Sequence, residues 1–354
     1  MNDSKSASSS ELQIKRASEK PPEGSLIMSG MRSTAHIHIG NYNGALKQWL
    51  ELQKDYDGFY GVMNWHAMTS RYKEPHDVMF FVRDIFAEWI AWGLDPEKNV
   101  IFVQSEVPEH IELNMFFMML TPMSWLERVP TWKDAIEDAK ATDTHNLGRF
   151  MYPVLQAADI AVYRATHVPI GQDQIPHLEL SRDIIKRFNF LYGGNLPEPK
   201  PIFSETPTLI GSDGRKMSKS YNNAFQLTQE DADVMKTLRA MPTDPARVRR
   251  TDVGDPDKCP VYSFHKLYSG AEDLKWAAEG CRTAGIGCGD CKRKLGENIS
   301  SAMAEPREKK KELLASGKLD RIIADGCDRA RKEARKQLNQ VKEWTGFKPG
   351  GDWL

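Results

Sequence analysis

The sequence predicts an α/β fold, a doubly wound parallel sheet followed by an all-helical C-terminal domain. Short apolar runs have the length of strands and lie at residues 26–30, 58–68, 99–107 and 167–171. Helical patterns of ten or more residues separate these runs, at residues 43–56, 75–94 and 173–188. Strands that alternate with such helices are typical of a parallel sheet with right-handed crossovers. The first domain is therefore expected to be Rossmann-like, with ligands at the carboxyl ends of its strands.

Changes in pattern along the chain predict the domain boundaries. Residues 1–24 are rich in Ser, Lys and Glu without an apolar core, which favours a flexible tail and excludes a secretory signal. The sheet domain is expected at 25–220. Strand patterns stop after about residue 221, and helical patterns such as 328–344 continue, so the helical domain is expected at 221–354.

The composition of the 354 residues is typical of a globular protein, with 27% charged and 40% hydrophobic residues. The formal net charge is −1, so a polyanionic partner would have to bind a local basic patch. Residues 111–132 are rich in Met and aromatic side chains, which predicts either a buried helical core or a subunit interface. No apolar run approaches the roughly 20 residues that span a bilayer, and a cytoplasmic location is expected.

The first motif follows the first predicted strand. His36 and His38 alternate with isoleucines and precede Gly40 and Asn41, where a helical pattern begins. A strand, a glycine turn and a helix form a geometry in which backbone amides and a helix N-terminus bind phosphate. A zinc pair and two incidental polar residues are the alternatives, although zinc would need further ligands. The motif alone does not decide between them.

The second motif lies in a hydrophilic, glycine-rich stretch at 211–223. Lys216 and Lys219 flank Met217 and Ser218 there, and Ser220 follows. Two lysines on a mobile loop suit a polyphosphate whose charge must be neutralised while a phosphate group departs. A solvated surface turn is the alternative.

Together the motifs carry a resemblance. Residues 38–41, His-Ile-Gly-Asn, resemble the first signature of class I aminoacyl-tRNA synthetases, and residues 216–220, Lys-Met-Ser-Lys-Ser, match the second. From about Leu26 onward the chain is similar to the tryptophanyl-tRNA synthetase family, in stretches such as VQSEVPEH, MYPVLQAADI and VPIGQDQIPHLELSRD. The resemblance implies activation of tryptophan with ATP and Mg²⁺, transfer to tRNA(Trp), a homodimer, and an anticodon-binding role for the helical domain. A tyrosyl-tRNA synthetase and a synthetase paralogue with a regulatory role remain as alternatives.

The resemblance also implies roles for individual residues. His38, Asn41, Lys216 and Lys219 are the expected catalytic residues. Asp159 is expected to accept the indole N–H of tryptophan, with Tyr152 and Gln174 at the ammonium group and Met28 and Gly30 beside the ring. The residues expected at ATP are Arg32, Ser33, Thr34, Gly40, Asn41, Gly171, Gln172, Asp173, Leu209, Lys216, Met217, Ser218, Lys219 and Ser220.

Two departures from the family pattern concern the first motif and its neighbourhood. The loop before His38 reads Ser33-Thr34-Ala35, where the family usually has proline, then Ser or Thr, then glycine. Ser33 lacks the fixed φ of proline, and Ala35 lacks the freedom of glycine at positive φ. Asn64 stands where the family often has Asp. We expect these changes to affect rate and selectivity more than the class of reaction.

Four of the five cysteines lie close together, at Cys259, Cys281, Cys288 and Cys291, whereas Cys327 stands apart on a helical pattern. By spacing alone, four thiolates predict zinc first, and an iron–sulfur cluster second. The resemblance reverses this order, because a subset of the family carries such a quartet with a [4Fe–4S] cluster. Arg247, Arg249 and Arg250 precede the quartet and are candidates for tRNA contact, or for a solvated loop.

Overall fold

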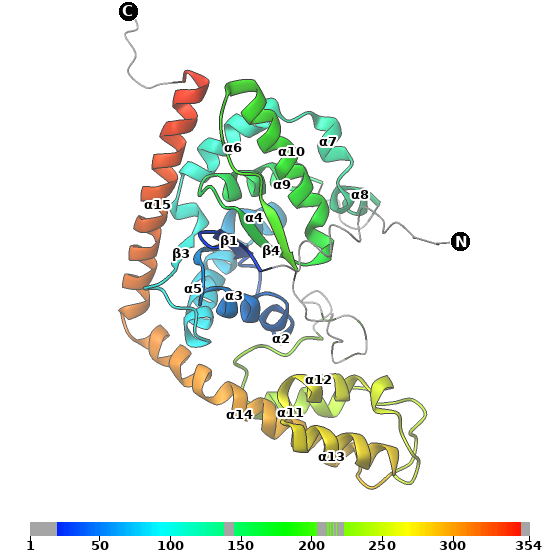
Figure 1. The fold of residues 1–354 in the computed structure, drawn as a ribbon. Helices are drawn as coiled ribbons and strands as arrows, with labels where there is room; N and C mark the ends of the chain where they lie inside the picture. The colour runs from blue at the N-terminus through cyan, green and yellow to red at the C-terminus, as the bar shows by residue number, and fades with distance from the viewer. Residues whose placement is uncertain are drawn as a thin grey trace, which may run out of the picture.

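The computed structural model describes residues 20–137, 145–203, 211, 213, 215, 217 and 223–347. Its centre is a five-stranded parallel sheet in the order β3-β2-β1-β4-β5 (Figure 1). The strands are β1 (Leu26–Met31), β2 (Asp57–Val62), β3 (Val100–Val103), β4 (His167–Ile170) and β5 (Lys200–Phe203). The chain moves outward from β1 to β3 and then crosses to β4 on the other side. The predicted doubly wound sheet is therefore confirmed, and β5 is a strand that the sequence patterns did not indicate.

Burial explains why these runs form parallel strands. β1 and β2 pair in register from Leu26 opposite Asp57 to Met31 opposite Val62. Consecutive residues of β2, which point to opposite faces of the sheet, are all buried from Gly58 to Val62. Such strands are covered on both faces by helices, as is usual for parallel sheets.

The helices of the α/β body surround this sheet. They are α2 (Ile39–Asn41), the π-helix η1 (Tyr42–Leu46), α3 (Lys47–Leu52), α4 (Asn64–Arg71), α5 (Pro75–Ala91), η2 (Gln104–Glu106), α6 (Glu109–Leu120), α7 (Met123–Glu127), α8 (Pro130–Glu137), α9 (Leu147–Ala161), η4 (Gln172–Gln174) and α10 (Ile175–Tyr192). The Met- and aromatic-rich segment forms α6 to α8. Leu113 and Phe117 of α6 are fully buried, whereas Met119 and Met123 are 76% and 67% exposed. The buried-core interpretation is thus confirmed for part of the segment, and the subunit-interface interpretation stays a prediction for its exposed side chains.

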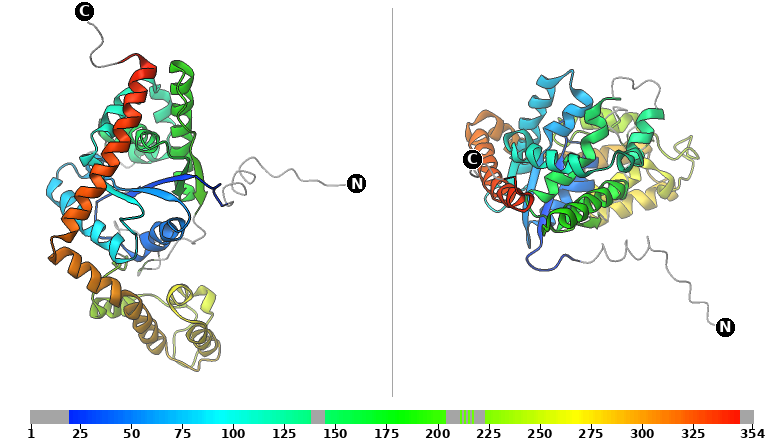
Figure 2. Two further views of the ribbon diagram at one scale, coloured as in Figure 1. Left: turned by 60° about the vertical axis from the view of Figure 1, so that its left-hand side comes forward. Right: turned by 90° about the horizontal axis from the view of Figure 1, so that it is seen from above.

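Every element after residue 223 in the described part of the chain is helical. These are α11 (Asp231–Ala240), η6 (Pro256–Lys258), α12 (Pro260–Tyr268), α13 (Ala271–Arg282), α14 (Cys288–Ala315) and α15 (Lys318–Thr345). Helices α11 to α13 gather around the first half of α14 in a separate lobe (Figures 1 and 2). We call this group the helical lobe. No helix in the described ranges is both long and apolar enough to cross a membrane.

Helix α15 does not belong to the helical lobe. It runs back along the α/β body, beside β3 and α6 (Figure 1). The amide of Val103 in β3 donates a hydrogen bond to Sγ of Cys327, at 3.4 Å. A Cβ atom at Gly326 would lie 1.9 Å from the carbonyl oxygen of Ile101, so only glycine lets the helix lie this close to the strand. The predicted region 221–354 is thus helical throughout its described part but packs as two units.

Candidate functional site

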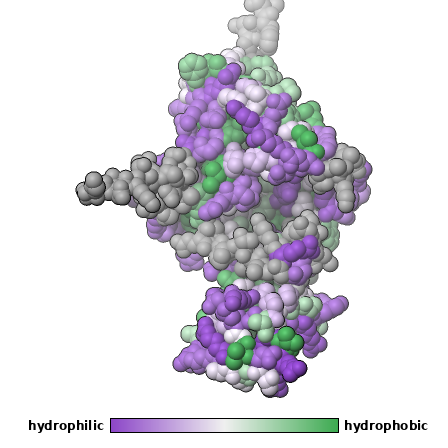
Figure 3. Space-filling model, turned by 90° about the vertical axis from the view of Figure 1, so that its right-hand side faces the viewer, coloured by the Kyte–Doolittle hydropathy of each residue, from purple (hydrophilic) through white to green (hydrophobic). Residues whose placement is uncertain are grey.

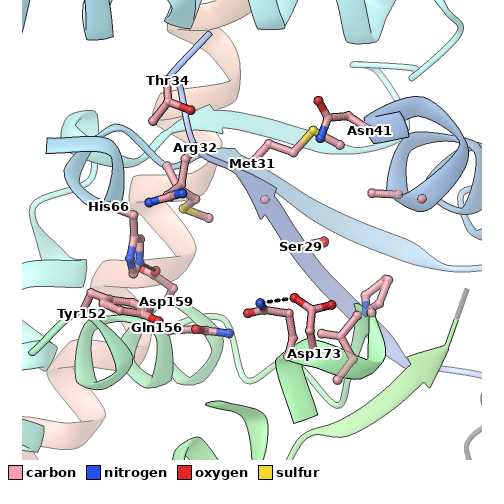
Figure 4. Close-up of a pocket in the computed structure, with 18 of the residues that line it drawn as sticks. Ser29, Met31, Arg32, Thr34, Asn41, His66, Tyr152, Gln156, Asp159 and Asp173 are labelled. Carbon is pink, nitrogen blue, oxygen red and sulfur yellow. Dashed lines mark hydrogen bonds and ion pairs between the residues drawn. The ribbon is translucent and has the colours of Figure 1, made fainter. Parts of the chain in front are cut away.

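A pocket of about 990 Å³ opens at the carboxyl ends of β1 and β4. This is the topological switch point of the sheet, because the connections leave β1 and β4 in opposite directions. Figure 4 shows its walls: Met31 and Arg32 from the end of β1, His66 from α4, and Asp159 and Tyr152 from α9. The fold therefore brings side chains from distant parts of the sequence to one cavity of a size suited to a nucleotide and a second small molecule.

The first motif forms the start of the helix on one side of this pocket. His38 is the N-cap of α2, and its Nδ1 accepts a hydrogen bond from the amide of Asn41, at 3.2 Å. Oδ1 of Asn41 in turn accepts from the amide of His38, at 3.3 Å. Because Nδ1 is the acceptor, the neutral ring carries its proton on Nε2. Both side chains line the pocket, so this reciprocal cap fixes them at its wall.

The chain that follows the second motif pairs with the first motif. His38 and Gln226 form an antiparallel bridge. The amide of Ile39 donates to the carbonyl of Phe225 at 2.9 Å, and the amide of Leu227 donates to the carbonyl of Ile37 at 2.8 Å. These bonds place the chain that follows the second motif directly beside the first motif.

Met217 and Gly40 make a second connection between the motifs. A Cβ atom at Gly40 would lie 2.9 Å from the His38 ring and 3.2 Å from Sδ of Met217. Met217 is buried and lines the pocket. Glycine at this position therefore permits Met217 to pack against the first motif.

Most of the second motif lies outside the described residues, namely Lys216, Ser218, Lys219 and Ser220, and so does Leu209. The described residues before it form an ordered turn. Asp213 accepts hydrogen bonds from the Asn223 side chain at 2.7 Å and from the Arg215 side chain at 2.8 Å. These bonds, the one from Asn223 foremost, lower the pKa of Asp213 to about 2. Asp213 thus stays anionic at neutral pH and joins Arg215 to Asn223.

The altered loop 33–35 lies at the mouth of the pocket. Thr34 and Ala35 line the pocket, and the carbonyl of Thr34 accepts a hydrogen bond from Arg71, at 2.6 Å. Arg32 is exposed to the open pocket, and the pocket walls surround its guanidinium group. Desolvation by these walls, and after it the charge of the neighbouring Arg149, lowers the pKa of Arg32. Ser33 instead is fully buried, does not line the pocket, and has no hydrogen-bond partner for Oγ among the described residues. The assignment of Ser33 to nucleotide binding stays a prediction, and its hydroxyl is buried outside the lining of the pocket.

Asp159 lies at the floor of the pocket, within α9, and is 2% exposed. Its Oδ2 accepts from Nε2 of His66 at 2.7 Å. Its Oδ1 is 2.6 Å from Nδ1 of His110 and 2.8 Å from Nε2 of Gln104. Burial alone would raise the pKa of Asp159, but the charge of His66 and the hydrogen bonds from both histidines hold it well below its usual range. A carboxylate accepts about four hydrogen bonds, so one acceptor position remains for a ligand.

A second polar group stands above Asp159. The Tyr152 hydroxyl lies 2.7 Å from Oγ1 of Thr131, and both hydroxyls are hydrogen-bonded to Nε2 of His177. Burial lowers the pKa of His177, so the ring is neutral at pH 7. On the facing side Gln174 donates to Asp173, at 2.9 Å (Figure 4). The cavity between these groups is lined by hydrogen-bonding side chains on two sides.

The pocket contains most of the residues that the sequence analysis assigned to it. Those that line it are Met28, Gly30, Arg32, Thr34, His38, Asn41, Tyr152, Asp159, Gly171, Asp173, Gln174 and Met217. Gly40 and Gln172 flank this set without lining the pocket. The sequence analysis missed His66, Thr131, Arg149 and Gln156, which also line it. Only His66 had a sequence signal, because it follows a strand, where ligands of parallel sheets bind.

The comparisons with known proteins agree with this geometry. Residues 22–304 match the family model described as tRNA synthetases class I (W and Y). The tryptophan–tRNA ligase of Thermotoga maritima is 44% identical, over 89% of this chain and 97% of that protein. The chain belongs to this synthetase family. The tryptophan–tRNA ligase of Ralstonia nicotianae is 38% identical, over 91% of this chain and 98% of its own length.

A solved structure supports the fold of the synthetase over its whole length. The tryptophanyl-tRNA synthetase of Campylobacter jejuni, complexed with ADP and tryptophan, matches with a TM-score of 0.84 at 32% identity. The match covers 91% of this chain and 99% of that one. The similarity therefore includes the helical region as well as the Rossmann-like sheet.

The cysteine quartet of this synthetase lies in the helical lobe, where three helices meet. Cys259 is the N-cap of α12, Cys281 is in the last turn of α13, and Cys288 and Cys291 are in the first turn of α14. Burial, and after it the nearby Cys259, Cys281 and Cys288, raise the pKa of the Cys291 thiol to about 12. Within the described residues no three His, Cys, Asp or Glu side chains are placed to hold a single metal ion.

The arginine candidates of the synthetase divide into two kinds. Arg247 is 7% exposed and donates from Nη2 to the carbonyls of Arg250 and Ile286. Burial raises the pKa of the Cys281 thiol, and the charge of Arg247 opposes this rise. The charge of Arg247 is thus turned inward beside the cysteines, and its assignment to tRNA stays a prediction. Arg249 and Arg250 are exposed.

Asn64 and His36, whose roles the sequence left open, have defined hydrogen-bond partners in the synthetase. Asn64 is buried at the start of α4, where it donates to Oγ of Ser105 at 2.7 Å and accepts from the Ser105 amide at 3.0 Å. It therefore joins the ends of β2 and β3. His36, which was weighed as a metal ligand or as incidental, hydrogen-bonds through Nδ1 to Asp84, at 2.8 Å. Neither interpretation of His36 holds, because it is a partner of a nearly buried carboxylate.

Proposed function

We propose that this chain is a tryptophan–tRNA ligase, which activates L-tryptophan with ATP and transfers it to tRNA(Trp). The observation that carries the proposal is that His38 and Asn41 face the same pocket as Asp159. A nucleotide site and a site for an indole N–H are thus adjacent, at the switch point of the sheet. The family and its tryptophan-specific relatives agree with this reaction.

The first step joins tryptophan to AMP. A carboxylate oxygen of tryptophan attacks the α-phosphorus of ATP, and the bond from that phosphorus to pyrophosphate breaks. The reaction needs in-line positioning and stabilisation of the leaving charge, and little covalent help. Nε2–H of His38 and the side-chain Nδ2 of Asn41 would bind the triphosphate, with Arg32 and Thr34 nearby. Lys216 and Lys219 would neutralise the departing pyrophosphate, and Mg²⁺ bound to the phosphates would share that role.

The pocket floor would select tryptophan. The remaining acceptor position of Asp159 would take the indole N–H, and an analogue without this group would leave the buried carboxylate incompletely bonded. Tyr152 and Gln174 would hold the ammonium group, and Met28 and Gly30 would pack against the ring. Gly171 and Asp173 at the start of η4 would meet the ribose. Tyrosine would have to fill an indole-sized space with its smaller ring.

The second step is transfer to tRNA. A ribose hydroxyl of the terminal adenosine attacks the acyl carbon, and AMP leaves. We assign the anticodon to the helical lobe, where the exposed Arg249 and Arg250 can pair with phosphates. Residues 25–220 then supply the catalytic domain and residues 221–354 the tRNA-binding region, with 1–24 as a tail. Since ATP and tRNA are cytoplasmic, we place the reaction in the cytoplasm.

The cysteine quartet would hold a [4Fe–4S] cluster that fastens α12, α13 and α14 together. The donor set fits, because such clusters are held by four Cys thiolates. Zinc is the alternative, because four thiolates in a closed site also suit that ion. The cluster would supply a cross-link in the helical lobe, not chemistry at the pocket.

A homodimer would cover exposed apolar side chains of the α/β body. Met115, Met119 and Met123 on α6 and α7 are 45%, 76% and 67% exposed. Methionine and aromatic side chains are favoured at such interfaces. The face shown in Figure 3 is hydrophilic in most places, with scattered hydrophobic patches. We take the exposed methionines of α6 and α7 as the candidate subunit contact.

The deciding experiment is amino-acid-dependent exchange of labelled pyrophosphate into ATP. We expect exchange with tryptophan, not with tyrosine or without an amino acid, and its loss in Asp159→Ala. Exchange with tyrosine instead would identify a tyrosyl-tRNA synthetase. No exchange with either amino acid would contradict the enzyme and favour a paralogue with a regulatory role.

A further inference from the structure

A buried ionic cluster connects the helical region to the α/β body beside the pocket, whose lining includes Ile37 and Ile85. Nζ of Lys310, on α14, lies 2.7 Å from Oδ1 of Asp84 and 2.5 Å from Oε2 of Glu88, both on α5. His36 binds the other oxygen of Asp84, at 2.8 Å. Oγ1 of Thr228 lies 3.1 Å from Oε2 of Glu88 and 3.3 Å from Nζ of Lys310. We call these five residues the Lys310 cluster.

The charges of the Lys310 cluster are removed from water. The side chains of Lys310, Asp84 and Glu88 are 12%, 9% and 1% exposed. Buried charges are costly unless they are paired, and removal of one partner leaves the other uncompensated. Without Lys310, two neighbouring carboxylates would face each other with only His36 and Thr228 as partners. The ammonium group of Lys310 is therefore required to hold Asp84 and Glu88 of α5 side by side.

Both ATP motifs are tied to the cluster through short pieces of chain. His36 stands two residues before His38, the N-cap that faces the pocket. Thr228 directly follows Leu227, whose amide bonds the carbonyl of Ile37. Residues 225–227 also continue from the second motif at 216–220. Lys310 of α14 thus contacts Thr228 directly and is joined to His36 through Asp84. These two residues flank Leu227 and Ile37, which form the small bridge between the two chain segments.

We infer that Lys310 is a positioning residue for adenylate formation: it transmits the placement of α14 to His38 and to residues 225–227, which follow the second motif, and so sets the affinity for ATP. Because it acts on those segments, the inference rests on their proposed role at the triphosphate. The tryptophan subsite is built differently, from Asp159, His66 and His110, and none of these touches the cluster. Loss of Lys310 should therefore change KM for ATP more than KM for tryptophan.

A second ion pair on the same helix provides the matched control. Arg307 is one turn away on α14, its side chain is 10% exposed, and it pairs with Asp231 of α11 at 2.8 Å. It is a buried cation like Lys310, but its partner belongs to the helical lobe and contacts neither motif. Arg307→Met therefore reports what the loss of a buried cation of α14 does to folding alone.

The test compares Lys310→Met with Arg307→Met by pyrophosphate exchange, with ATP and tryptophan varied separately. Couplings between sites are typically about fivefold or more. We expect Lys310→Met to raise KM for ATP by about that factor, KM for tryptophan to change less than about twofold, and Arg307→Met to change neither. An equal rise in both KM values, or no rise in KM for ATP, would overturn the inference.

Two further variants keep the test decisive. Thr228→Val keeps the ion pairs and the side-chain shape, so it should fold even if Lys310→Met does not, and should raise KM for ATP in the same direction. An unchanged KM for ATP in Thr228→Val then counts against the inference. His38→Ala in the same assay separates the two proposals: if it abolishes exchange while the cluster variants leave KM for ATP unchanged, the proposed function stands and the role of Lys310 falls.

Discussion

His110 joins Asp159 to Tyr163: its Nδ1 lies 2.6 Å from Oδ1 of Asp159, and its Nε2 lies 2.8 Å from the Tyr163 hydroxyl. His110 is fully buried, and the Tyr163 ring stacks on Phe59 of β2 with centroids 4.2 Å apart. When the tyrosine hydroxyl donates to Nε2, Nδ1–H points to the carboxylate. The sheet thus orients the carboxylate that we assign to the indole, through two side chains that do not line the pocket.

The first prediction concerns this chain of hydrogen bonds. His110→Phe removes a hydrogen bond to a charged group, worth roughly 1.5–3 kcal/mol. We expect kcat/KM for tryptophan to fall by about 10- to 100-fold in pyrophosphate exchange, with KM for ATP unchanged. Tyr163→Phe, which leaves the bond to Asp159 in place, should have a smaller effect in the same direction. An equal loss of kcat/KM for tryptophan and for ATP would mean that the variant damages the fold and not the orientation of Asp159.

The second prediction concerns the pH dependence of stability. The pKa of Asp159 is depressed in the folded chain, against the effect of burial, by His66 and His110. A depressed carboxyl pKa stabilises the fold above the unfolded value of about 4 and ceases to do so as the pH falls below it. Urea unfolding of Asp159→Asn should therefore show a weaker loss of stability between about pH 5 and pH 3 than the parent chain. Parallel pH profiles for the two proteins would contradict this account.

The sequence predicted the sheet and the first motif because both depend on local patterns. Strands and helices follow from apolar periodicity, and His38 with Asn41 from a strand, a glycine turn and a helix. The surroundings of Asp159 could not be predicted in this way, since His66, Gln104 and His110 come from different elements that only the tertiary fold brings together. The same limit explains Ser33 and Arg247, whose burial no local pattern revealed.

His36 shows the limit most clearly. Its spacing from His38 placed both on one face of an extended segment, which left a metal pair and coincidence open. The actual partner, Asp84, is 48 residues away on α5. The partner of that carboxylate, Lys310, is on a helix near the end of the chain. A role that depends on three such distant segments leaves no periodic trace in the sequence.

The third prediction concerns the contact between the two motifs. In Gly40→Ala the new methyl group would lie 2.9 Å from the His38 ring and 3.2 Å from Sδ of Met217, so one of them must move. We expect a rise in KM for ATP of about tenfold, as for a displaced phosphate-binding group worth about 1.4 kcal/mol. Gly317→Ala is the control, because its new methyl group would meet open space at a negative φ. That variant should leave kinetics unchanged and stability equal or slightly higher.

The fourth prediction concerns the cysteine quartet. Anaerobic reconstitution with iron and sulfide should give the parent chain a brown chromophore with four irons for each chain. Cys291→Ser should lose it, because a [4Fe–4S] cluster requires four thiolates, and Cys327→Ser should retain it. Cys327 is the matched control, since it is 4% exposed and packs against β3, on the opposite side of the fold from the quartet. Binding of zinc without iron would exclude the cluster. Because the quartet joins α12, α13 and α14, its loss should weaken aminoacylation of tRNA more than pyrophosphate exchange, which depends on the pocket alone.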